Sequence, residues 1–331
     1  MNKRALRADG LLLLTAGVWG FGFVAQRSGM EYVGPFAYNG IRFALGGLCL
    51  LPLIAVMRKL AGPAGTRTAS IVKTAGYSLA AGACLFAAVM LQQLGLMFTT
   101  AGNSGFITGL YVVLTPIFGI FLGRKTGAAT WLGSVLTVAG LYFLCAAGHL
   151  DSINPGDLLT LACAILWACH VLLIDRLVRD IDPLVLSAGQ FAVCGILAFI
   201  GAFLVEPRIA SWAGHISPAL LETKTLAWLP LPTLLDRLLA HTLVFPVQAW
   251  IPILYGGLCA VGIGYTLQVV AQRDAPPAHA TIILCFEGCF AALGGVLLLA
   301  EKIGHWTLLG FALMLAGMLV TQWEIITGKA P

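Results

Sequence analysis

Polar and ionisable side chains inside long apolar runs are the residues of this sequence best suited to chemistry. A charge at the centre of a membrane span costs about 2.5–3.5 kcal/mol on insertion scales, so such a group must face protein or a water-filled cavity. Few residues of the 331 are of this kind. The residues that we expect to line one central cavity and bind its contents are Trp19, Asn39, Arg42, Gln92, Asn103, Tyr111, Trp167, His170, Gln190, Tyr265, Gln268 and Glu287.

Arg42 and Glu287 are the two charges that the sequence places nearest to the middle of the apolar runs. One comes from each half of the chain, so each can neutralise the other. A carboxylate whose distance from a guanidinium changes with conformation can take up and release a proton, and this predicts proton coupling. The alternatives are an ion pair that only fixes helix packing, and an Arg42 side chain that reaches the outer membrane surface.

Two tryptophans and one histidine also have alternative roles. Trp19 and Trp167 each lie about ten residues into an apolar run, which favours a cavity wall over a belt at the membrane surface. For His170, a hydrogen-bonded packing role is preferred to a proton relay. All three stay among the candidate cavity residues.

Metal and nucleophile chemistry has weaker support. All nine cysteines fall inside apolar runs, where cysteine behaves as a small buried hydrophobe. Cys285 and Cys289 are one helical turn apart and Cys169 adjoins His170, so a metal site is the alternative to packing. The Gly-Asn-Ser-Gly run at 102–105 looks like the GxSG pattern of intramembrane serine proteases, but Ser104 and His279 occupy near-equivalent turns of an internal repeat. No Walker loop, HExxH or Rossmann pattern occurs. We therefore predict no catalytic residue, metal or cofactor.

The polar residues recur because the chain contains a two-fold internal repeat. Residues 98–140 and 274–317 each contain a small-residue turn, an apolar run, a charged pair and a second apolar run with glycines seven positions apart. Trp19 precedes Trp167 by 148 positions, and Arg42 precedes Gln190 by the same number. Polar residues at equivalent depths favour one cavity lined from both halves.

Composition indicates an all-α integral membrane protein. The chain is 59% hydrophobic and 10% charged, which is too little charge to cover a water-soluble globule of this length. Its net charge of +5 forms no basic face, so nucleic acid is not an expected partner. Apolar runs of about 20 residues predict ten transmembrane helices. They cover 10–29, 36–57, 73–97, 101–123, 129–147, 156–176, 183–205, 248–271, 278–300 and 303–324.

These spans predict two inverted five-helix repeats, residues 1–147 and 150–326. An odd number of spans per repeat makes the second repeat enter the membrane from the opposite side. With a cytoplasmic N-terminus, thirteen Lys and Arg fall in inner segments and five in outer ones, so both termini are expected in the cytoplasm. The long outer loop at 206–247 contains leucines at helical spacing, typical of an amphipathic helix on the membrane surface or of a loop helix packed on the protein.

The chain resembles the drug/metabolite transporter superfamily, in the branch built from two EamA domains. The likeness covers almost all of the chain outside 206–247. The residues that carry it are Val18-Trp19-Gly20, Pro35 to Arg42, the small-residue turn at 101–104, Phe286-Glu287, Leu299-Ala300-Glu301-Lys302 and the glycine-spaced last span. The chain departs from the family where Glu287-Gly288 replaces a common Glu-Pro pair and Arg124 replaces a Glu, which indicates a subgroup of its own.

This resemblance implies a secondary transporter that moves a small organic metabolite across a bacterial cytoplasmic membrane by alternating access, with efflux preferred. Amino acid-like, nucleobase-like and drug-like solutes are the expected classes. The expected partners are this solute and the lipid bilayer, and no oligomeric state is assigned. The alternatives are a non-transporting membrane scaffold or receptor and, third, an intramembrane serine protease.

Overall fold

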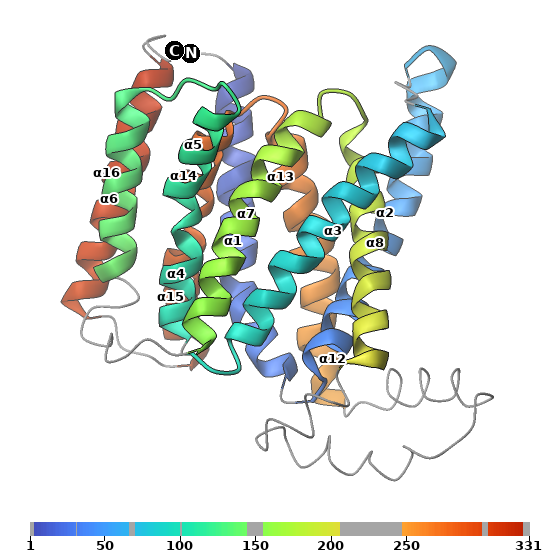
Figure 1. Ribbon diagram of the computed structural model, residues 1–331, viewed down its shortest axis with the longest axis horizontal. Coiled ribbons are helices and arrows are strands. Elements are labelled where there is room, and N and C mark those ends of the chain that lie inside the picture. The colour runs from blue at the N-terminus through green and yellow to red at the C-terminus, as the bar shows by residue number, and fades with distance from the viewer. Residues whose placement is uncertain are drawn as a thin grey trace.

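The structure is a computed structural model that describes residues 3–30, 32–65, 70–99, 101–143, 155–205, 247–299 and 304–326. Within these ranges the chain forms helices and turns without a strand, which confirms an all-α membrane protein. Seven of the helical segments described are long and apolar enough to cross a membrane. The elements (Figure 1) are α1 (Lys3–Met30), α2 (Pro35–Gly65), α3 (Ile71–Gly95), α4 (Ala101–Gly109), α5 (Tyr111–Phe121), α6 (Ala128–Leu141), α7 (Pro155–Leu177), α8 (Pro183–Leu204), α12 (Val247–Leu254), the π-helix η3 (Tyr255–Tyr265), α13 (Thr266–Ala271), α14 (Pro277–Leu284), α15 (Glu287–Leu299) and α16 (His305–Ile326).

Helices occur at the positions of the predicted spans, and the count of membrane crossings stays a prediction. The first helix begins earlier than the apolar run predicts, at Lys3, because the basic residues before the run continue the same helix into a polar environment. For α6, which runs over Ala128–Leu141, the predicted end at 147 lies outside the described residues. The helix expected within 206–247 lies outside the described residues.

Two predicted spans are each divided into two helices. Between α4 and α5, the amide of Leu110 donates to the carbonyl of Ile107 at 3.2 Å, a bond that spans three residues and tightens the turn. Between α14 and α15, the amide of Phe286 donates to the carbonyl of Ile283 at 3.1 Å in the same way. Each break therefore starts a new helix beside the centre of the bundle.

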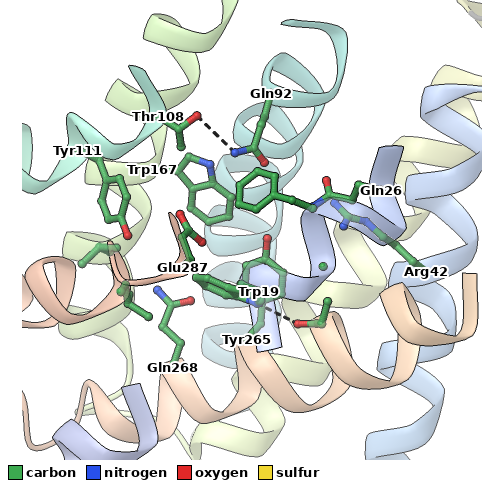
Figure 2. A pocket seen from close by; sticks show the side chains of 15 residues that line it. Trp19, Gln26, Arg42, Gln92, Thr108, Tyr111, Trp167, Tyr265, Gln268 and Glu287 are labelled. Carbon is green, nitrogen blue, oxygen red and sulfur yellow. Dashed lines mark hydrogen bonds between the residues drawn. The ribbon is translucent and has the colours of Figure 1, made fainter. Parts of the chain in front are cut away.

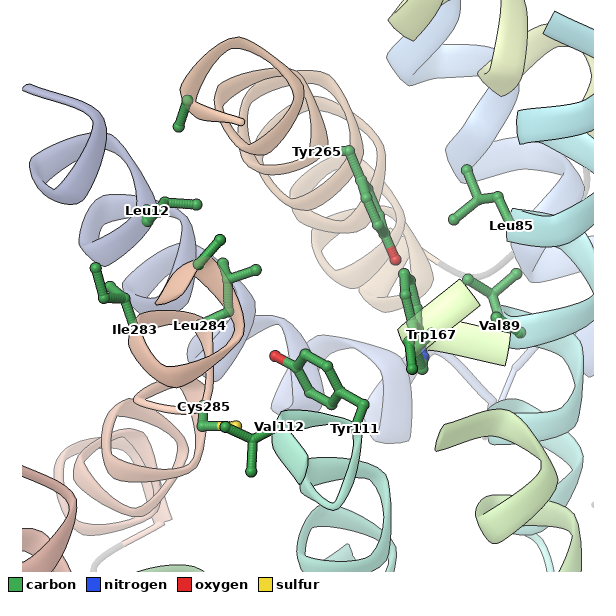
Figure 3. Packing of buried hydrophobic residues seen from close by; sticks show 14 of the residues in the cluster. Leu12, Leu85, Val89, Tyr111, Val112, Trp167, Tyr265, Ile283, Leu284 and Cys285 are labelled. Carbon is green, nitrogen blue, oxygen red and sulfur yellow. The ribbon is translucent and has the colours of Figure 1, made fainter. Parts of the chain in front are cut away.

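The two breaks lie against each other. The thiol of Cys285 donates to the carbonyl of Gly109 at 3.6 Å, and Figure 3 shows Cys285 beside Val112. As a result Tyr111 and Glu287, which are 176 positions apart, are the first residues of α5 and α15. Each break therefore places a polar side chain at the start of a helix.

The contacts between the two halves come in corresponding pairs. α1 packs on α15 as α7 packs on α4 and α5, and α2 packs on η3 as α3 packs on α8. Contacts also join α2 to α8 and α6 to α16. The pair of α6 and α16 forms one side of the bundle (Figure 1). Corresponding helices of the two halves thus have corresponding neighbours.

The contact between α6 and α16 depends on the glycines that are seven positions apart in the sequence. A Cβ atom on Gly133 would lie 2.7 Å from the carbonyl oxygen of Gly317. In the same way, a Cβ atom on Gly317 would lie 2.7 Å from the carbonyl oxygen of Gly133. A Cβ on Gly140 would lie 2.7 Å from the carbonyl oxygen of Gly310. Small residues at these positions let the two helix backbones approach closely, as they do between membrane helices generally.

Candidate functional site

A cavity of about 40 Å³ lies at the centre of the bundle, between the two halves (Figure 2). One ordered water needs about 10–15 Å³ of such space, so the cavity holds roughly three waters in this conformation. The predicted residues that line it are Trp19, Arg42, Gln92, Tyr111, Trp167, Tyr265, Gln268 and Glu287. Side chains from distant parts of the sequence therefore converge on one polar and aromatic site.

Three aromatic side chains form a wall of the cavity. The ring centroids of Trp19 and Tyr265 are 4.5 Å apart, and Trp167 stacks on Tyr265 with centroids 5.8 Å apart and an interplanar angle of 11°. The indole nitrogen of Trp19 donates to the carbonyl of Ala260 at 3.0 Å, which fixes its ring against η3. Such a wall offers apolar surface and π faces to a bound organic group.

Arg42 supplies a guanidinium from α2 and is 2% exposed. Its Nε donates to Oδ1 of Asn39 at 2.7 Å, and its central carbon lies 5.5 Å and 5.1 Å from the ring centroids of Tyr38 and Phe43. Asn39 does not line the cavity; its amide also donates to the carbonyl of Pro35 at 3.0 Å and so holds the arginine in place. The cation is thereby fixed without using all its donors, because a guanidinium has five N–H groups.

Glu287 supplies the opposite charge from the first turn of α15. Arg42 lines the same cavity, yet the described residues contain no ion pair between the two side chains. The expected mutual neutralisation is therefore not formed in this conformation, and Figure 2 shows Gln26 beside Arg42 and away from Glu287. The two side chains therefore line one cavity without binding each other.

Amide and hydroxyl groups complete the lining. The side-chain amide of Gln92 donates to the hydroxyl of Thr108 at 3.4 Å, and Gln268 contributes a further amide from α13. Gln26 and Thr108 line the cavity although they were not among the predicted residues. The signal for Gln26 was present in the sequence, since it lies seven positions, or two helical turns, after Trp19.

Two further predicted residues do not line the cavity. His170 and Gln190 are fully buried and bind each other, with Nε2 of His170 3.0 Å from Oε1 of Gln190. The ring of His170 meets Trp167 edge-on at 5.6 Å, so it supports the aromatic wall from behind. The side chain of Asn103 lies outside the described part of the structure.

The residues considered for nucleophile and metal chemistry are separated. Nε2 of His279 lies 2.7 Å from Oδ1 of Asp9, so this histidine joins α14 to α1 and does not contact Ser104. In the described ranges no three His, Cys, Asp or Glu side chains are grouped closely enough to hold a metal.

Polar contacts join the helices at the end of the bundle where α1 begins and α16 ends (Figure 1). The amide of Gln272 donates to the carbonyl of Val171 at 3.0 Å, and Arg124 binds the buried carboxylate of Asp175. At the rim, Asp180 accepts bonds from Lys73 and Tyr77; the Lys73 ammonium is the main reason why the pKa of Asp180 lies below its ordinary value. These contacts hold α3, α7, α13 and the turn after α5 together, and we refer to this end of the bundle as the closed end.

Comparison with known proteins gives consistent matches. The profile of the EamA-like transporter family matches residues 6–146 and 225–323. A protein of Archaeoglobus fulgidus named as an uncharacterized transporter is 26% identical over 323 residues, covering 97% of this chain and 88% of its own. Human solute carrier family 35 member F6 is 24% identical over 241 residues, covering 65% of this chain and 64% of its own. A crystal structure with 18% identity has a TM-score of 0.69 over 95% of this chain and 96% of its own, which indicates a shared fold.

Proposed function

Since the chain belongs to the EamA-like transporter family and is a multi-pass membrane transporter, we propose that it moves a small organic metabolite by alternating access through the central cavity, with export preferred. We place it in a bacterial cytoplasmic membrane with both termini in the cytoplasm. The observation that carries this proposal is the convergence of Arg42, Glu287 and an aromatic wall on one site between the two halves.

The chemistry of the cavity favours a solute with mixed polarity. A guanidinium attracts a carboxylate or phosphate group, while a carboxylate attracts an ammonium group or a proton. The aromatic wall suits an apolar or aromatic body, and π faces also attract cations. Among the expected classes, an amino acid-like solute fits this arrangement best, with its anionic group at Arg42 and its cationic group at Glu287.

The small size of the cavity supports a mechanism that includes a conformational change. A space for roughly three waters is too small for an organic metabolite, so the helices must separate before the solute can enter. In the proposed topology the closed end faces the cytoplasm, because it carries both termini. The polar contacts of Gln272 and Arg124 must then break when the transporter opens inward.

The corresponding helix contacts of the two halves support an inverted repeat as the structural basis of this change. We propose the repeats as residues 1–147 and 150–326. The contact of α1 with α15 corresponds to the contact of α7 with α4 and α5. When each contact adopts the geometry of the other, a transporter that is open on one side of the membrane becomes open on the opposite side.

The first test is to identify the solute and then measure its flux. Untargeted metabolite comparison of cells that lack or overproduce the protein gives candidates, and an exported solute accumulates inside the deletion strain. Purified protein in proteoliposomes should then transport the candidate faster than protein-free vesicles. No solute-dependent flux for any accumulated metabolite would contradict the proposal and favour a non-transporting role.

Orientation is tested separately by cysteine labelling in a background that lacks the nine native cysteines. An impermeant maleimide added outside intact cells should label a cysteine at position 224, in the outer loop, and should reach position 124 only after the cells are opened. The reverse pattern would contradict the proposed topology.

A further inference from the structure

A second hollow, the arginine cleft, lies at the end of the bundle that carries the N-terminus (Figure 1). It has a volume of about 520 Å³ and is lined by Arg4 and Arg7 of α1, by Arg179 after α7 and by Arg273 after α13. Three separate segments therefore bring four guanidinium groups to one concavity. This convergence goes beyond the scatter of basic residues that topology alone requires.

The wall from α1 is a single helical face. Arg4, Arg7, Ala8 and Leu11 are spaced by three, one and three residues, so they lie on one side of the helix. The basic residues come first and the apolar ones follow one turn later, where the apolar run of α1 begins. Val270 continues the apolar floor from α13. The cleft thus combines a basic rim with an apolar floor at the depth where polar and apolar surroundings meet.

The charge of the cleft is strongly positive. Asp274 is the carboxylate that lines it, against four arginines. Arg179 is held in position by Asp175, through Nε to the backbone carbonyl at 3.1 Å and through the guanidinium to Oδ1 at 3.2 Å. Within the described residues, Arg7 and Arg273 make no ion pair. Two guanidinium groups are therefore available to an external anion without breaking an internal pair.

We propose that the arginine cleft binds the phosphate headgroup of an anionic phospholipid. Guanidinium groups bind phosphate oxygens in a bidentate manner, and basic pockets between membrane helices bind anionic headgroups. The apolar floor of Leu11 and Val270 receives the glycerol and first methylene groups, which a soluble phosphate lacks. A bound lipid contacts α1, the end of α7 and the turn after α13 together, so it stabilises the closed end of the bundle.

The test uses purified full-length protein in neutral detergent, with phosphatidylglycerol as the probe. Native mass spectrometry counts bound lipid, and thermal unfolding measures stabilisation. Phosphatidylcholine with the same acyl chains and free glycerol phosphate serve as the two comparison ligands. We expect phosphatidylglycerol to bind and raise the Tm, phosphatidylcholine and glycerol phosphate to do so much less, and the effect to weaken at high salt.

The double variant Arg7→Gln/Arg273→Gln should lose about thirtyfold in affinity for phosphatidylglycerol, at roughly 1 kcal/mol per removed cation. The matched control is Arg58→Gln/Lys59→Gln, which removes two exposed cations from α2 outside the cleft and should keep wild-type binding. An equal loss in the control, equal binding of phosphatidylcholine, or equal stabilisation by glycerol phosphate would each overturn the proposal. If the double variant does not fold, the comparison of phosphatidylglycerol with phosphatidylcholine and glycerol phosphate on the wild-type protein still tests the proposal.

Discussion

The indole rings of Trp19 and Trp167 lie with their centroids 6.2 Å apart at the centre of the bundle. The two residues are 148 positions apart in the sequence and hold corresponding places in the first helix of each half. Both also contact Tyr265, so one aromatic wall is built from the two halves. A movement of one half relative to the other must therefore change the shape of this wall.

Replacing Glu287 with Gln should abolish any dependence of transport on a pH gradient. The amide keeps the size and hydrogen-bonding capacity of the side chain, so the Tm should stay near that of the wild type, while the group can no longer exchange a proton. Solute flux in proteoliposomes with and without an imposed gradient measures the effect. Asp180→Asn is the control, because this exposed carboxylate is not among the residues that line the cavity. Unchanged gradient-driven flux in Glu287→Gln would remove this carboxylate from the mechanism.

Replacing Arg42 with Ala should reduce both stability and transport. The change removes the bond to Asn39 and the contacts with the rings of Tyr38 and Phe43, which together are worth about 2–4 kcal/mol. It also leaves the carboxyl group of Glu287 without a cationic side chain among the described residues that line the cavity. The exposed Arg58 on the same helix is the control, and Arg58→Ala should change stability by less than about 0.5 kcal/mol. Equal thermal stability of the two variants would show that Arg42 does not hold the helix in place.

Two glycines of α1 should respond oppositely to alanine. A Cβ on Gly20 would lie 2.5 Å from Cβ of Phe290 and 2.7 Å from the carbonyl oxygen of Glu287, so Gly20→Ala should destabilise the protein by about 1–3 kcal/mol and displace α15. Nothing lies within 4 Å of a Cβ on Gly10, so Gly10→Ala should be neutral or stabilise by about 0.5–1 kcal/mol. Thermal unfolding of both variants is the measurement. A Gly20→Ala protein as stable as Gly10→Ala would contradict the close contact of α1 with α15.

Removing Arg124 should loosen the closed end of the bundle. The carboxylate of Asp175 is 1% exposed and binds both Arg124 and Arg179, so Arg124→Gln leaves a buried charge with one cation instead of two. We expect a loss of about 1–3 kcal/mol, below the full cost of an unpaired buried charge, because Arg179 remains. Lys125→Gln removes the adjacent cation and should have little effect on the Tm. Equal Tm losses in the two variants would mean that stability depends on the positive charge of this turn and not on the bond between Arg124 and Asp175.

The sequence by itself determined the class of the protein and much of its site. Runs of apolar residues with little charge are compatible only with membrane helices, because backbone polar groups must be satisfied within each span. Since burial of a polar group in such a run is costly, the few that occur point inward, and most of the predicted residues do line the cavity. Even Gln26 could have been found from its helical spacing to Trp19.

Tertiary structure alone decided which of these groups meet. Hydropathy indicates whether a residue is buried but does not identify its neighbours. Asn39, His170 and Gln190 are buried polar residues, as predicted, but they contact the residues that line the cavity and do not line it themselves. The breaks at Leu110 and Phe286 were equally hidden, because a tightened turn leaves the apolar pattern of the span unchanged. The separation of Arg42 from Glu287 depends on how α2 and α15, which belong to different halves, are placed around the cavity. Such packing is a property of the assembled bundle, since the residues concerned are far apart along the chain.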